Sequence, residues 1–457
     1  MPLSGLDEFQ AQAVASPGHT LVVAGPGAGK TRVLLARAEK LLEDGLPPER
    51  LFLLTFTVRA ARELRERLAK PGVIVETFHA LAYRLAREQG HAPKLEDEED
   101  YTRLLTLAAG HPLEKEEIHL LIDEFQDLSP ELVAFLRRFE RACFFLVGDP
   151  AQAIYGFRGA RPEVALDFAR SLPSLKIHYL LRSYRVPEKI LEAAQPLRDD
   201  FGLETPRLQA TIANGNLQGL GYPNPEREAK GIAKIIAEAL GGLQMERSRL
   251  GLSPGEVAVL ARVRPLLAKV KNVLQDEGIP VIDQDERQKV REEELKALLK
   301  EASWVRDLTG LLSSAKKLST ETKKEIEDLV SEAKDLEEAL FRLRFLLWEK
   351  GVLKAQTAVN LLTIHQAKGL EFKVVILIGA EEGLLPFTFW PEVDEAEEKR
   401  LAYVALTRSA QTFFFTVAKK RFLYGRRYPG KISPYFSSLP FTETKTSPPP
   451  RRQKSLF

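Results

Sequence analysis

One stretch of the sequence has the residue types of a phosphate-binding loop. It reads Ala24-Gly25-Pro26-Gly27-Ala28-Gly29-Lys30-Thr31-Arg32, and it lies between a short apolar segment and a segment with helical periodicity. Glycines let backbone N–H groups approach phosphate oxygens, Lys30 can reach the outer phosphates, and the Thr31 hydroxyl can ligate magnesium. Ala24 stands where the usual pattern has its first glycine. The stretch predicts a nucleotide site.

A second stretch places two adjacent carboxylates after another apolar segment. Asp123 and Glu124 follow Leu121 and Ile122 directly. Carboxylate oxygens are ligands that Mg²⁺ prefers, and a carboxylate near a phosphate can accept a proton from the attacking water. We therefore expect Asp123 to hold magnesium, directly or through water, and Glu124 to act as the general base. Beside the phosphate loop, these carboxylates indicate a P-loop nucleotide hydrolase.

The order of apolar and helical segments predicts how these residues are brought together. Short apolar runs alternate with longer segments of helical periodicity, which is typical of parallel strands connected by helices, so the predicted fold class is α/β. The runs fall into two groups. The expected strands are Leu21–Ala24, Leu51–Phe56, His119–Ile122, Phe144–Val147 and Ile177–Leu181 in the first group, and Glu256–Leu260, Ala358–Ile364, Lys373–Ile378 and Thr412–Val417 in the second.

Two mainly helical stretches interrupt these groups, and a segment rich in proline, serine and threonine follows them. The helical stretches carry apolar residues at spacings of three and four amid charges, whereas the last segment has too few apolar residues to fold alone. The predicted organisation is a first domain at 1–180 with a helical insertion near 83–117, a second domain at 181–283 and 351–440, a helical insertion at 284–350 and a flexible basic tail at 441–457.

Composition excludes several classes of protein. The chain has 457 residues, a formal net charge of +2 and a single cysteine, Cys143, so an internal disulfide framework and a cysteine-based metal site are excluded. No apolar run approaches the roughly 20 residues that span a membrane, and no secretory signal is recognisable. We expect a cytoplasmic protein. His365 has no second histidine or glutamate at metal spacing, which favours a structural or phosphate-sensing role.

The remaining motifs resemble those of superfamily 1 helicases of the UvrD, Rep and PcrA type. Gly148–Ala160 resembles the third motif of that family, and the resemblance extends from about Leu6 to Lys420. It implies two RecA-like parallel-sheet lobes of the P-loop NTPase type, each with a small, mainly helical insertion. The other matching segments, in family order, are Leu6–Val14, Thr55–Leu64, Thr77–Ala80, Ser183–Arg185, Thr363–Phe372 and Glu397–Arg408.

The resemblance implies that ATP and Mg²⁺ are the cofactors and that ATP lies between the two lobes. Gln10 would read the adenine edge, because an amide offers a donor and an acceptor together. Tyr184 would stack on the base, and Glu371 would accept a hydrogen bond from the ribose. The residues implied at the terminal phosphate are Arg185 and Arg408, which would act as arginine fingers, and Gln152, which would sense the phosphate.

The resemblance also implies a path for single-stranded DNA. Stacking of unpaired bases on aromatic side chains is largely independent of sequence, which suits a motor. Phe157 stands where a tryptophan is frequent in the family, so a somewhat weaker grip is expected. The alternative for the aromatic residues is that they belong to the core. The implied stacking surfaces are Phe56, Tyr155 and Phe157, and the residues implied near the strand are Thr77, His79 and Arg158.

Two features depart from full-length members of the family. Both insertions are short, which implies an intact motor with weak strand separation. The last residues include Gln453, Leu456 and Phe457, which resemble the short motif by which DNA-associated enzymes dock on a ring-shaped sliding clamp. A polar tail without a partner is the equal alternative for this segment.

The expected function is an ATP-dependent translocase or helicase on single-stranded DNA and at single/double-strand junctions. The resemblance implies 3′-to-5′ polarity and a role in DNA repair, replication or recombination, and a monomer is expected. One alternative is a remodeller that strips proteins from DNA with weak unwinding. Another is a non-catalytic module recruited to clamps, against which the intact set of catalytic residues argues. A helicase–nuclease is disfavoured, because no carboxylate-rich domain follows Lys420.

Overall fold

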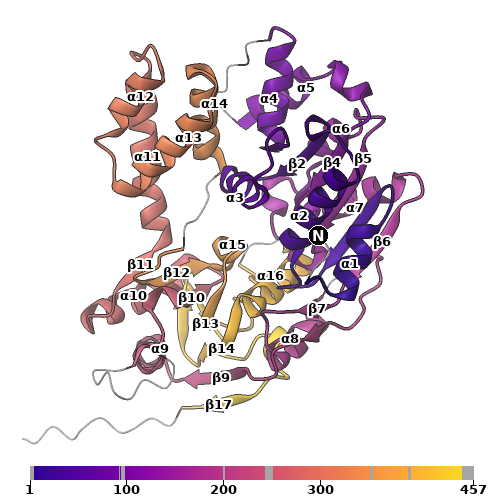
Figure 1. Ribbon diagram of the computed structural model, residues 1–457. Helices are drawn as coiled ribbons and strands as arrows, with labels where there is room; N and C mark the ends of the chain where they lie inside the picture. Colours follow the sequence, from indigo (N-terminus) through magenta and orange to yellow (C-terminus); the bar gives the residue numbers. More distant parts are fainter. Residues whose placement is uncertain are drawn as a thin grey trace, which may run out of the picture. The chain divides into compact units, whose positions relative to one another are not determined.

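The alternating segments form two mainly parallel sheets in a computed structural model (Figure 1). The structure describes residues 5–91, 93, 98–198, 201–241, 251–349, 354–389 and 393–444. Two compact units are present. The first combines Met1–Arg185, Asp199–Gln209 and Gln284–Leu353, and the second combines Val186–Arg198, Ala210–Asp283 and Lys354–Phe457.

The sheet of the first unit has six strands, which pair in parallel in the order β3-β2-β4-β5-β1-β6. Every residue of β1 and β2 is buried, because helices cover both faces of the sheet and the strands are therefore continuously apolar. The strands are β1 (Thr20–Ala24), β2 (Leu51–Thr55), β3 (Ile74–Thr77), β4 (His119–Ile122), β5 (Cys143–Gly148) and β6 (Lys176–Leu180).

Two apolar cores lie on opposite faces of this sheet. Leu21 and Val23 belong to one core, and the alternate residues Val22 and Ala24 belong to the other, as expected for side chains that alternate along a strand. The helices that cover the sheet are α1 (Glu8–Ala15), α2 (Lys30–Glu43), α3 (Val58–Leu68), α4 (Phe78–Glu88), α5 (Glu98–Leu107), α6 (Pro130–Leu136) and α7 (Pro162–Ser171).

The sheet of the second unit has seven strands, which pair in parallel in the order β11-β12-β10-β13-β14-β9-β17. Its strands are β9 (Asn216–Tyr222), β10 (Val257–Ala261), β11 (Val281–Asp283), β12 (Val359–Thr363), β13 (Phe372–Ile378), β14 (Ser409–Ala418) and β17 (Phe441–Glu443). Its helices are α8 (Glu188–Ala194), α9 (Pro225–Leu240), α10 (Leu267–Asp276), α15 (Ile364–Ala367) and α16 (Glu395–Thr407). Two parallel sheets of this kind confirm the predicted α/β fold with two RecA-like lobes.

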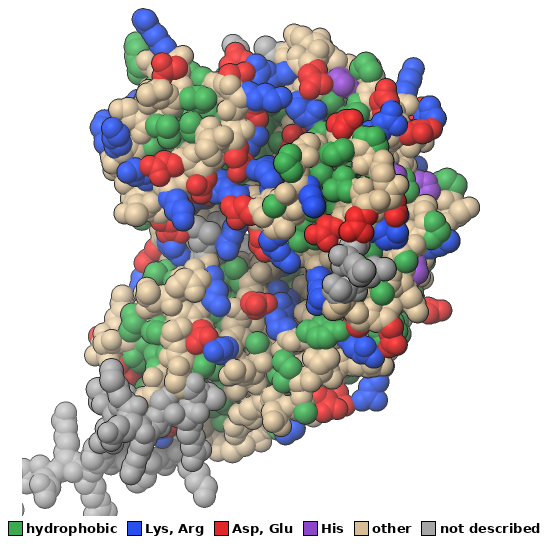
Figure 2. Space-filling model, in the orientation of Figure 1, with side chains coloured by type: hydrophobic (Ala, Val, Ile, Leu, Met, Phe, Trp, Pro, Cys, Tyr) green, Lys and Arg blue, Asp and Glu red, His purple; other side chains and the backbone are tan. Residues whose placement is uncertain are grey.

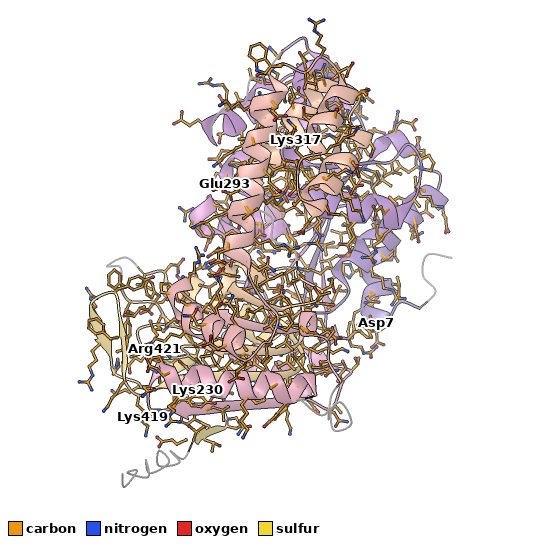
Figure 3. The ribbon with its side chains drawn as sticks, turned by 90° about the vertical axis from the view of Figure 1, so that its left-hand side faces the viewer. Asp7, Lys230, Glu293, Lys317, Lys419 and Arg421 are labelled. Carbon is orange, nitrogen blue, oxygen red and sulfur yellow. The ribbon has the colours of Figure 1, made fainter. Side chains whose placement is uncertain are left out.

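A buried ion cluster fastens a hairpin to the second unit. The hairpin consists of β15 (Arg421–Leu423) and β16 (Arg426–Tyr428). The Arg421 guanidinium lies 2.5 Å from Glu228 of α9 and 2.7 Å from Glu381, and the three side chains are 3%, 0% and 0% exposed. Figure 3 labels Arg421. The Thr416 hydroxyl donates to Glu228 over 2.6 Å, and the Ala418 N–H donates to Glu381 over 2.8 Å. We name Arg421, Glu228 and Glu381 the sealed cluster.

Four helices lie within residues 284–350, the stretch predicted as the second insertion: α11 (Gln284–Ala302), α12 (Leu308–Ala315), α13 (Thr320–Glu332) and α14 (Leu336–Glu349). In sequence they interrupt the second sheet between β11 and β12. In the structure they belong to the first unit, where α14 lies beside α4 (Figure 1). Lys, Arg, Asp and Glu side chains are interspersed on the face drawn in Figure 2, in keeping with ion pairs such as Arg291 with Glu325 at 2.7 Å.

Two short strands, β7 (Arg182–Ser183) and β8 (Gln209–Ala210), lie where the chain passes between the units. The second domain was predicted to begin at residue 181, whereas residues 182–185 belong to the first unit. The predicted clamp motif at Gln453, Leu456 and Phe457 lies outside the described residues. Among the residues that the structure describes, no helix is long and apolar enough to cross a membrane.

Candidate active site

The phosphate loop connects β1 to α2 and depends on glycines at two positions. Gly27 and Gly29 have φ angles of +69° and +83°, in the left-handed region that favours glycine. A Cβ atom on Gly29 would lie 2.7 Å from the side-chain nitrogen of Gln10, and one on Gly27 would lie 2.7 Å from the Cβ of Arg185. The loop therefore packs closely against both neighbours, and its backbone leads into the N-terminus of α2, where anions bind favourably.

A charged group of one lysine and two carboxylates lies at this edge of the sheet. The Lys30 ammonium is 2.6 Å and 2.7 Å from the two carboxylate oxygens of Glu124. Asp123 is 8% exposed, and burial together with the charge of Glu124 raises its pKa to about 7. Burial alone would lower the pKa of Lys30, but the charges of Glu124, Asp123 and Asp149 together raise it. We name Lys30, Asp123 and Glu124 the loop-side cluster.

The backbone at Glu124 is strained. Its φ and ψ angles are +51° and +44°, a left-handed conformation that costs a residue with a Cβ roughly 1–2 kcal/mol. This turn ends the extended chain after β4 and starts a 3₁₀ turn at Phe125–Asp127. The strain is stored where the carboxylate meets Lys30, a location typical of functional sites.

A chain of hydrogen bonds leads from the loop-side cluster to the next strand. The Gln126 side-chain amide donates to Glu124 over 2.5 Å, and its carbonyl oxygen accepts from the backbone N–H of Asp149 over 3.0 Å. The Gln152 amide then donates to the Asp149 carboxylate over 2.7 Å. A Cβ atom on Gly148 would lie 2.0 Å from the Gln126 oxygen, so glycine is required there. We name this connection, from Lys30 to Gln152, the relay.

Gln126 and Asp149 were missed as site residues in the sequence. They lie within the Asp123–Asp127 and Gly148–Ala160 motifs, yet neither type of residue suggests a role without its neighbour. The available signal was topological, because β4 and β5 are adjacent parallel strands and the residues that follow them lie side by side. The residues that follow the carboxyl ends of such strands form the ligand sites of open α/β sheets.

The predicted base-binding residues surround the phosphate loop on another side. Gln10 is 1% exposed, donates to the Ala28 carbonyl over 3.0 Å and accepts from the Asp7 N–H over 3.2 Å. The Tyr184 hydroxyl donates to the Asp7 carboxylate over 2.5 Å, and the Tyr184 N–H donates to the Gly27 carbonyl over 3.0 Å. Tyr184 is 43% exposed, so its ring is accessible for stacking, whereas the Gln10 amide holds the loop against α1.

The predicted phosphate and ribose residues are divided between the units. Arg185 lies in the same unit as the phosphate loop, next to Gly27. Glu371 and Arg408 lie in the second unit. Arg408 is 2% exposed, and its guanidinium donates to the carbonyls of Val404 and Leu370 over 3.1 Å and 3.3 Å. Their roles at the nucleotide stay predictions.

Three of the predicted DNA-binding residues form a group just after the relay in which Phe157 and Arg158 are exposed and Tyr155 is half-buried. The Tyr155 and Phe157 rings meet edge to face with centroids 6.0 Å apart, and Phe157 is 66% exposed. The Arg158 guanidinium lies 5.3 Å from the Tyr155 ring and 5.7 Å from the Phe157 ring, within the range of a cation–π contact. We name Tyr155, Phe157 and Arg158 the aromatic–arginine group.

The other predicted DNA-binding residues lie deeper. Phe56 is half-buried against Phe78, with ring centroids 5.0 Å apart. Thr77 is 3% exposed and caps α4 by accepting from the Ala80 N–H over 3.1 Å. His79 is 8% exposed among aromatic rings, and burial lowers its pKa to about 4. Contacts of Thr77 and His79 with DNA stay predictions, and the positions of these side chains are those of core residues.

Comparison with known proteins agrees with this geometry. Residues 9–158 match the family model of an AAA domain, and residues 288–420 match that of a UvrD-like helicase C-terminal domain. The chain is 26% identical to DNA helicase II of Escherichia coli, with 96% of this chain and 88% of that protein covered. It is 24% identical to the ATP-dependent DNA helicase PcrA of Bacillus subtilis, with 96% and 86% covered.

The relatives are longer than this chain. The alignment with DNA helicase II spans 635 positions, whereas the chain has 457 residues, so that relative has segments without a counterpart here.

The phosphate loop, the paired carboxylates and the two parallel sheets define a P-loop nucleotide hydrolase with two RecA-like lobes. Within that class, the chain belongs to the UvrD-like superfamily 1 helicases, and it is an ATP-driven enzyme of that family.

Proposed function

We propose that this protein is an ATP- and magnesium-dependent motor that moves along single-stranded DNA in the 3′-to-5′ direction and acts at single/double-strand junctions. Its work would belong to DNA repair, replication or recombination. The observation that carries the proposal is the relay, which leads from Lys30 at the phosphate loop to Gln152. The aromatic–arginine group begins three residues further along the chain, at Tyr155.

The residues at the loop fit magnesium. The Thr31 hydroxyl and the Asp123 carboxylate are hard oxygen donors, and Mg²⁺ is usually held by one or two protein ligands together with substrate phosphates. Among the described residues, no group of three or more His, Cys, Asp or Glu side chains could hold a metal. The raised pKa of Asp123 reflects a buried site with excess negative charge, which a cation would relieve. When bound, magnesium supplies charge neutralisation to the phosphates.

Lys30 would exchange partners during the reaction. In the structure its ammonium pairs with Glu124, and a nucleotide phosphate at the loop would compete for the same three donors. Transfer of Lys30 to the phosphate would release Glu124 to accept a proton from the attacking water. The hydrogen bond from Gln126 would keep the Glu124 carboxylate in place. Hydrolysis would then change the hydrogen bonding of Glu124, and the relay would transmit that change to Gln152.

We propose that both units complete the nucleotide site. Gln10 and Tyr184 would contact the base, Arg185 and Arg408 the terminal phosphate, and Glu371 the ribose, as the family resemblance implies. Arginine suits the phosphate position because its guanidinium is permanently charged and offers paired donors. Differential contact of these residues with ATP and ADP would drive opening and closing of the lobes.

The aromatic–arginine group would hold the DNA. Base stacking on an aromatic side chain contributes about 1–3 kcal/mol and tolerates any base. The Phe157 ring is 66% exposed and so accessible to an unpaired base, and Arg158 adds positive charge beside it. Phe56, Thr77 and His79 would line the path more deeply, as the family resemblance implies.

A protein-stripping remodeller with weak unwinding is the second candidate. The observation that favours it is the length of the chain relative to DNA helicase II, because segments of that helicase have no counterpart here. Displacement of a protein bound to single-stranded DNA, without separation of an adjacent duplex, would support it. Processive unwinding of a long duplex by the monomer would reject it.

The test of the proposed function is ATP hydrolysis with and without single-stranded DNA, followed by a polarity assay on duplexes with a 3′ or a 5′ tail. We expect strong stimulation by DNA and movement from the 3′ tail. Equal hydrolysis with and without DNA would contradict the motor, and activity from the 5′ tail alone would contradict the polarity.

Docking on a sliding clamp through Gln453, Leu456 and Phe457 stays a proposal of its own. A short motif near DNA gains affinity from its high local concentration. Capture of the full chain by the clamp, compared with a chain that ends before Gln453, tests it. Equal recovery of the two chains would reject docking. Loss of ATP hydrolysis in the full chain would instead favour a clamp-recruited, non-catalytic module.

A further inference from the structure

Helix α14 of the insertion packs on the first unit through aromatic rings. Phe341 stacks on Tyr83 of α4, with ring centroids 4.0 Å apart and an interplanar angle of 11°. One turn later Phe345 contacts His79 at 5.3 Å, and Trp348 stacks on Tyr101 of α5 at 4.9 Å. Large aromatic contacts of this kind resist sliding, because each ring pair has a preferred geometry. The end of α14 is therefore held in register with α4 and α5.

Ion pairs surround these rings. Arg62 of α3 lies 2.8 Å from Asp328 and 3.1 Å from Glu332, both of α13. Arg87 of α4 lies 3.0 Å from Asp335 at the start of α14. The insertion is thus fixed to α3 and α4, the two helices that follow the predicted DNA-contacting segments.

Glu349 lies at the last position of α14 and reaches the first turn of α3. It is 8% exposed, and one of its carboxylate oxygens accepts from the Val58 backbone N–H over 2.9 Å. The first N–H groups of a helix have no partner within the helix, and Thr57 already caps Ala60 with its hydroxyl. Glu349 therefore satisfies an amide two residues after Phe56.

Three charged groups face this carboxylate from the neighbouring elements. Arg158 belongs to the 3₁₀ turn η5 (Gly156–Arg158), Arg291 to α11 and Glu325 to α13. Arg291 is paired with Glu325 at 2.7 Å. Burial raises the pKa of Glu349 to about 7, against the lowering effects of the Val58 N–H, Arg291 and Arg158. The carboxyl is therefore mostly neutral at pH 6 and mostly ionised at pH 8.

We propose that Glu349 is a positioning residue for single-stranded DNA: its side-chain Oε2 fixes the first turn of α3 beside Phe56, and its negative charge, when present, offsets the positive charge of Arg158. The inference rests on the proposed function, because it places Phe56 and Arg158 on the DNA path. The insertion would thus set how tightly the first unit holds DNA, through a residue that touches no nucleotide.

Two substitutions separate the two parts of this role. Glu349→Gln keeps an oxygen acceptor for the Val58 N–H and removes the charge at every pH. Glu349→Ala removes both the acceptor and the charge, and it leaves a buried N–H without its partner, which typically costs stability locally. At pH 6, where the wild-type carboxyl is mostly neutral, charge makes little difference between the variants and the wild type.

The measurement is the concentration of an oligothymidine that half-saturates ATP hydrolysis, taken at pH 6 and pH 8 at constant ionic strength. At pH 6 we expect Glu349→Gln to match the wild type and Glu349→Ala to need about five-fold more DNA, the size of a lost hydrogen bond. At pH 8 we expect Glu349→Gln to need about three-fold less DNA than the wild type, the size of a partly screened charge effect. The kcat at saturating DNA should change little.

A matched control is Glu337→Gln on the same helix. Glu337 is 70% exposed and pairs with Arg87 at 3.4 Å, away from α3, so its substitution should leave DNA affinity unchanged at both pH values. Equal DNA affinity of Glu349→Gln and the wild type at pH 8 would overturn the charge effect. Equal affinity of Glu349→Ala and Glu349→Gln at pH 6 would overturn the positioning effect.

The comparison of Glu349→Gln with the wild type at pH 8 decides the charge effect even if Glu349→Ala does not fold. Failure of the proposed function is recognisable separately, because the wild type itself would then show no stimulation by DNA.

Discussion

The loop-side cluster and the sealed cluster contain the same kinds of charge in different surroundings. Each has one cation and two carboxylates, and each lies in a unit built on a parallel sheet. In the loop-side cluster the Lys30 and Glu124 side chains are 16% and 30% exposed. In the sealed cluster Arg421 is 3% exposed, and both carboxylates are fully buried.

The difference in exposure and partners separates a site from a structural fastening. Lys30 is a flexible ammonium whose partner Glu124 can be reached from solvent, so a phosphate can replace that partner. The guanidinium of Arg421 is held by two carboxylates at once, which are themselves bonded to Thr416 and Ala418. Removing one member of such a buried group leaves an uncompensated charge. The charged groups of the loop-side cluster can therefore take part in chemistry, whereas those of the sealed cluster stabilise the fold.

The largest expected effect is on turnover. Lys30→Ala should lower kcat for ATP by about a thousand-fold or more, because electrostatic stabilisation of the transferred phosphoryl group is lost. Thermal stability should change little, since Glu124 can then be solvated. ATP hydrolysis with saturating single-stranded DNA measures the effect. Lys40→Ala on the same helix, which removes an exposed pair with Asp44, serves as control. Substantial activity in Lys30→Ala would remove the distinction between the clusters.

The opposite effect is expected in the sealed cluster. Arg421→Met should destabilise the protein by about 3–5 kcal/mol, because Glu228 and Glu381 would remain buried without their cation. Urea unfolding followed by circular dichroism measures the loss. Lys419→Met is the matched control, because it breaks an exposed pair with Glu443 at 2.7 Å and should cost little. If both substitutions cost the same, the sealed cluster contributes no more than a surface pair.

A smaller effect is expected in the relay. Gln126→Ala should lower the ratio of DNA-stimulated to unstimulated turnover about ten-fold, which corresponds to the loss of a hydrogen bond to a charged group. Gln89→Ala removes a side-chain hydrogen bond to the Ala109 carbonyl on the surface and is the control. An unchanged ratio in Gln126→Ala would show that the loop-side cluster communicates with DNA by another route.

The last prediction concerns Glu349, another buried carboxyl. Its pKa in the folded protein, about 7, is above the ordinary value of 4.5. The contribution of the neutral Glu349 carboxyl to the free energy of unfolding is therefore complete below about pH 4.5 and is lost as the pH rises through 7. Glu349→Gln should be more stable than the wild type by about 1–3 kcal/mol at pH 8.5 and equally stable at about pH 4. Urea unfolding at the two pH values tests this, and a pH-independent difference would contradict it.

Most of the strands could be predicted because buried parallel strands are continuous apolar runs. The predicted His119–Ile122 is β4, and the predicted Leu51–Phe56 differs from β2 by one residue. β9 was missed because Gly219 and Gly221 interrupt its apolar pattern. A Cβ atom on Gly219 would lie 2.2 Å from the Phe415 ring, so these glycines make room for aromatic side chains of neighbouring strands, which the local sequence does not reveal.

The site could be predicted where it depends on local spacing. The phosphate loop and the two carboxylates are adjacent in sequence to the strands that carry them. The relay needs β4 beside β5, and the docking of α14 needs a partner far away in sequence. The spacing of Phe341, Phe345 and Trp348 predicts an apolar helix face, but it does not identify Tyr83 and Tyr101 as the residues that the face contacts.

The docking of α14 on α4 has a consequence for biosynthesis. Arg87 and Asp335, which join the two helices, are 248 residues apart in the chain. Strands β9, β10 and β11 of the second unit are therefore synthesised after α4 and α5 and before α14. Until then Tyr83 and Tyr101 lack the covering rings of Phe341 and Trp348, and the nascent chain presents an aromatic surface of the kind that chaperones protect. The first unit begins to fold early and is finished late.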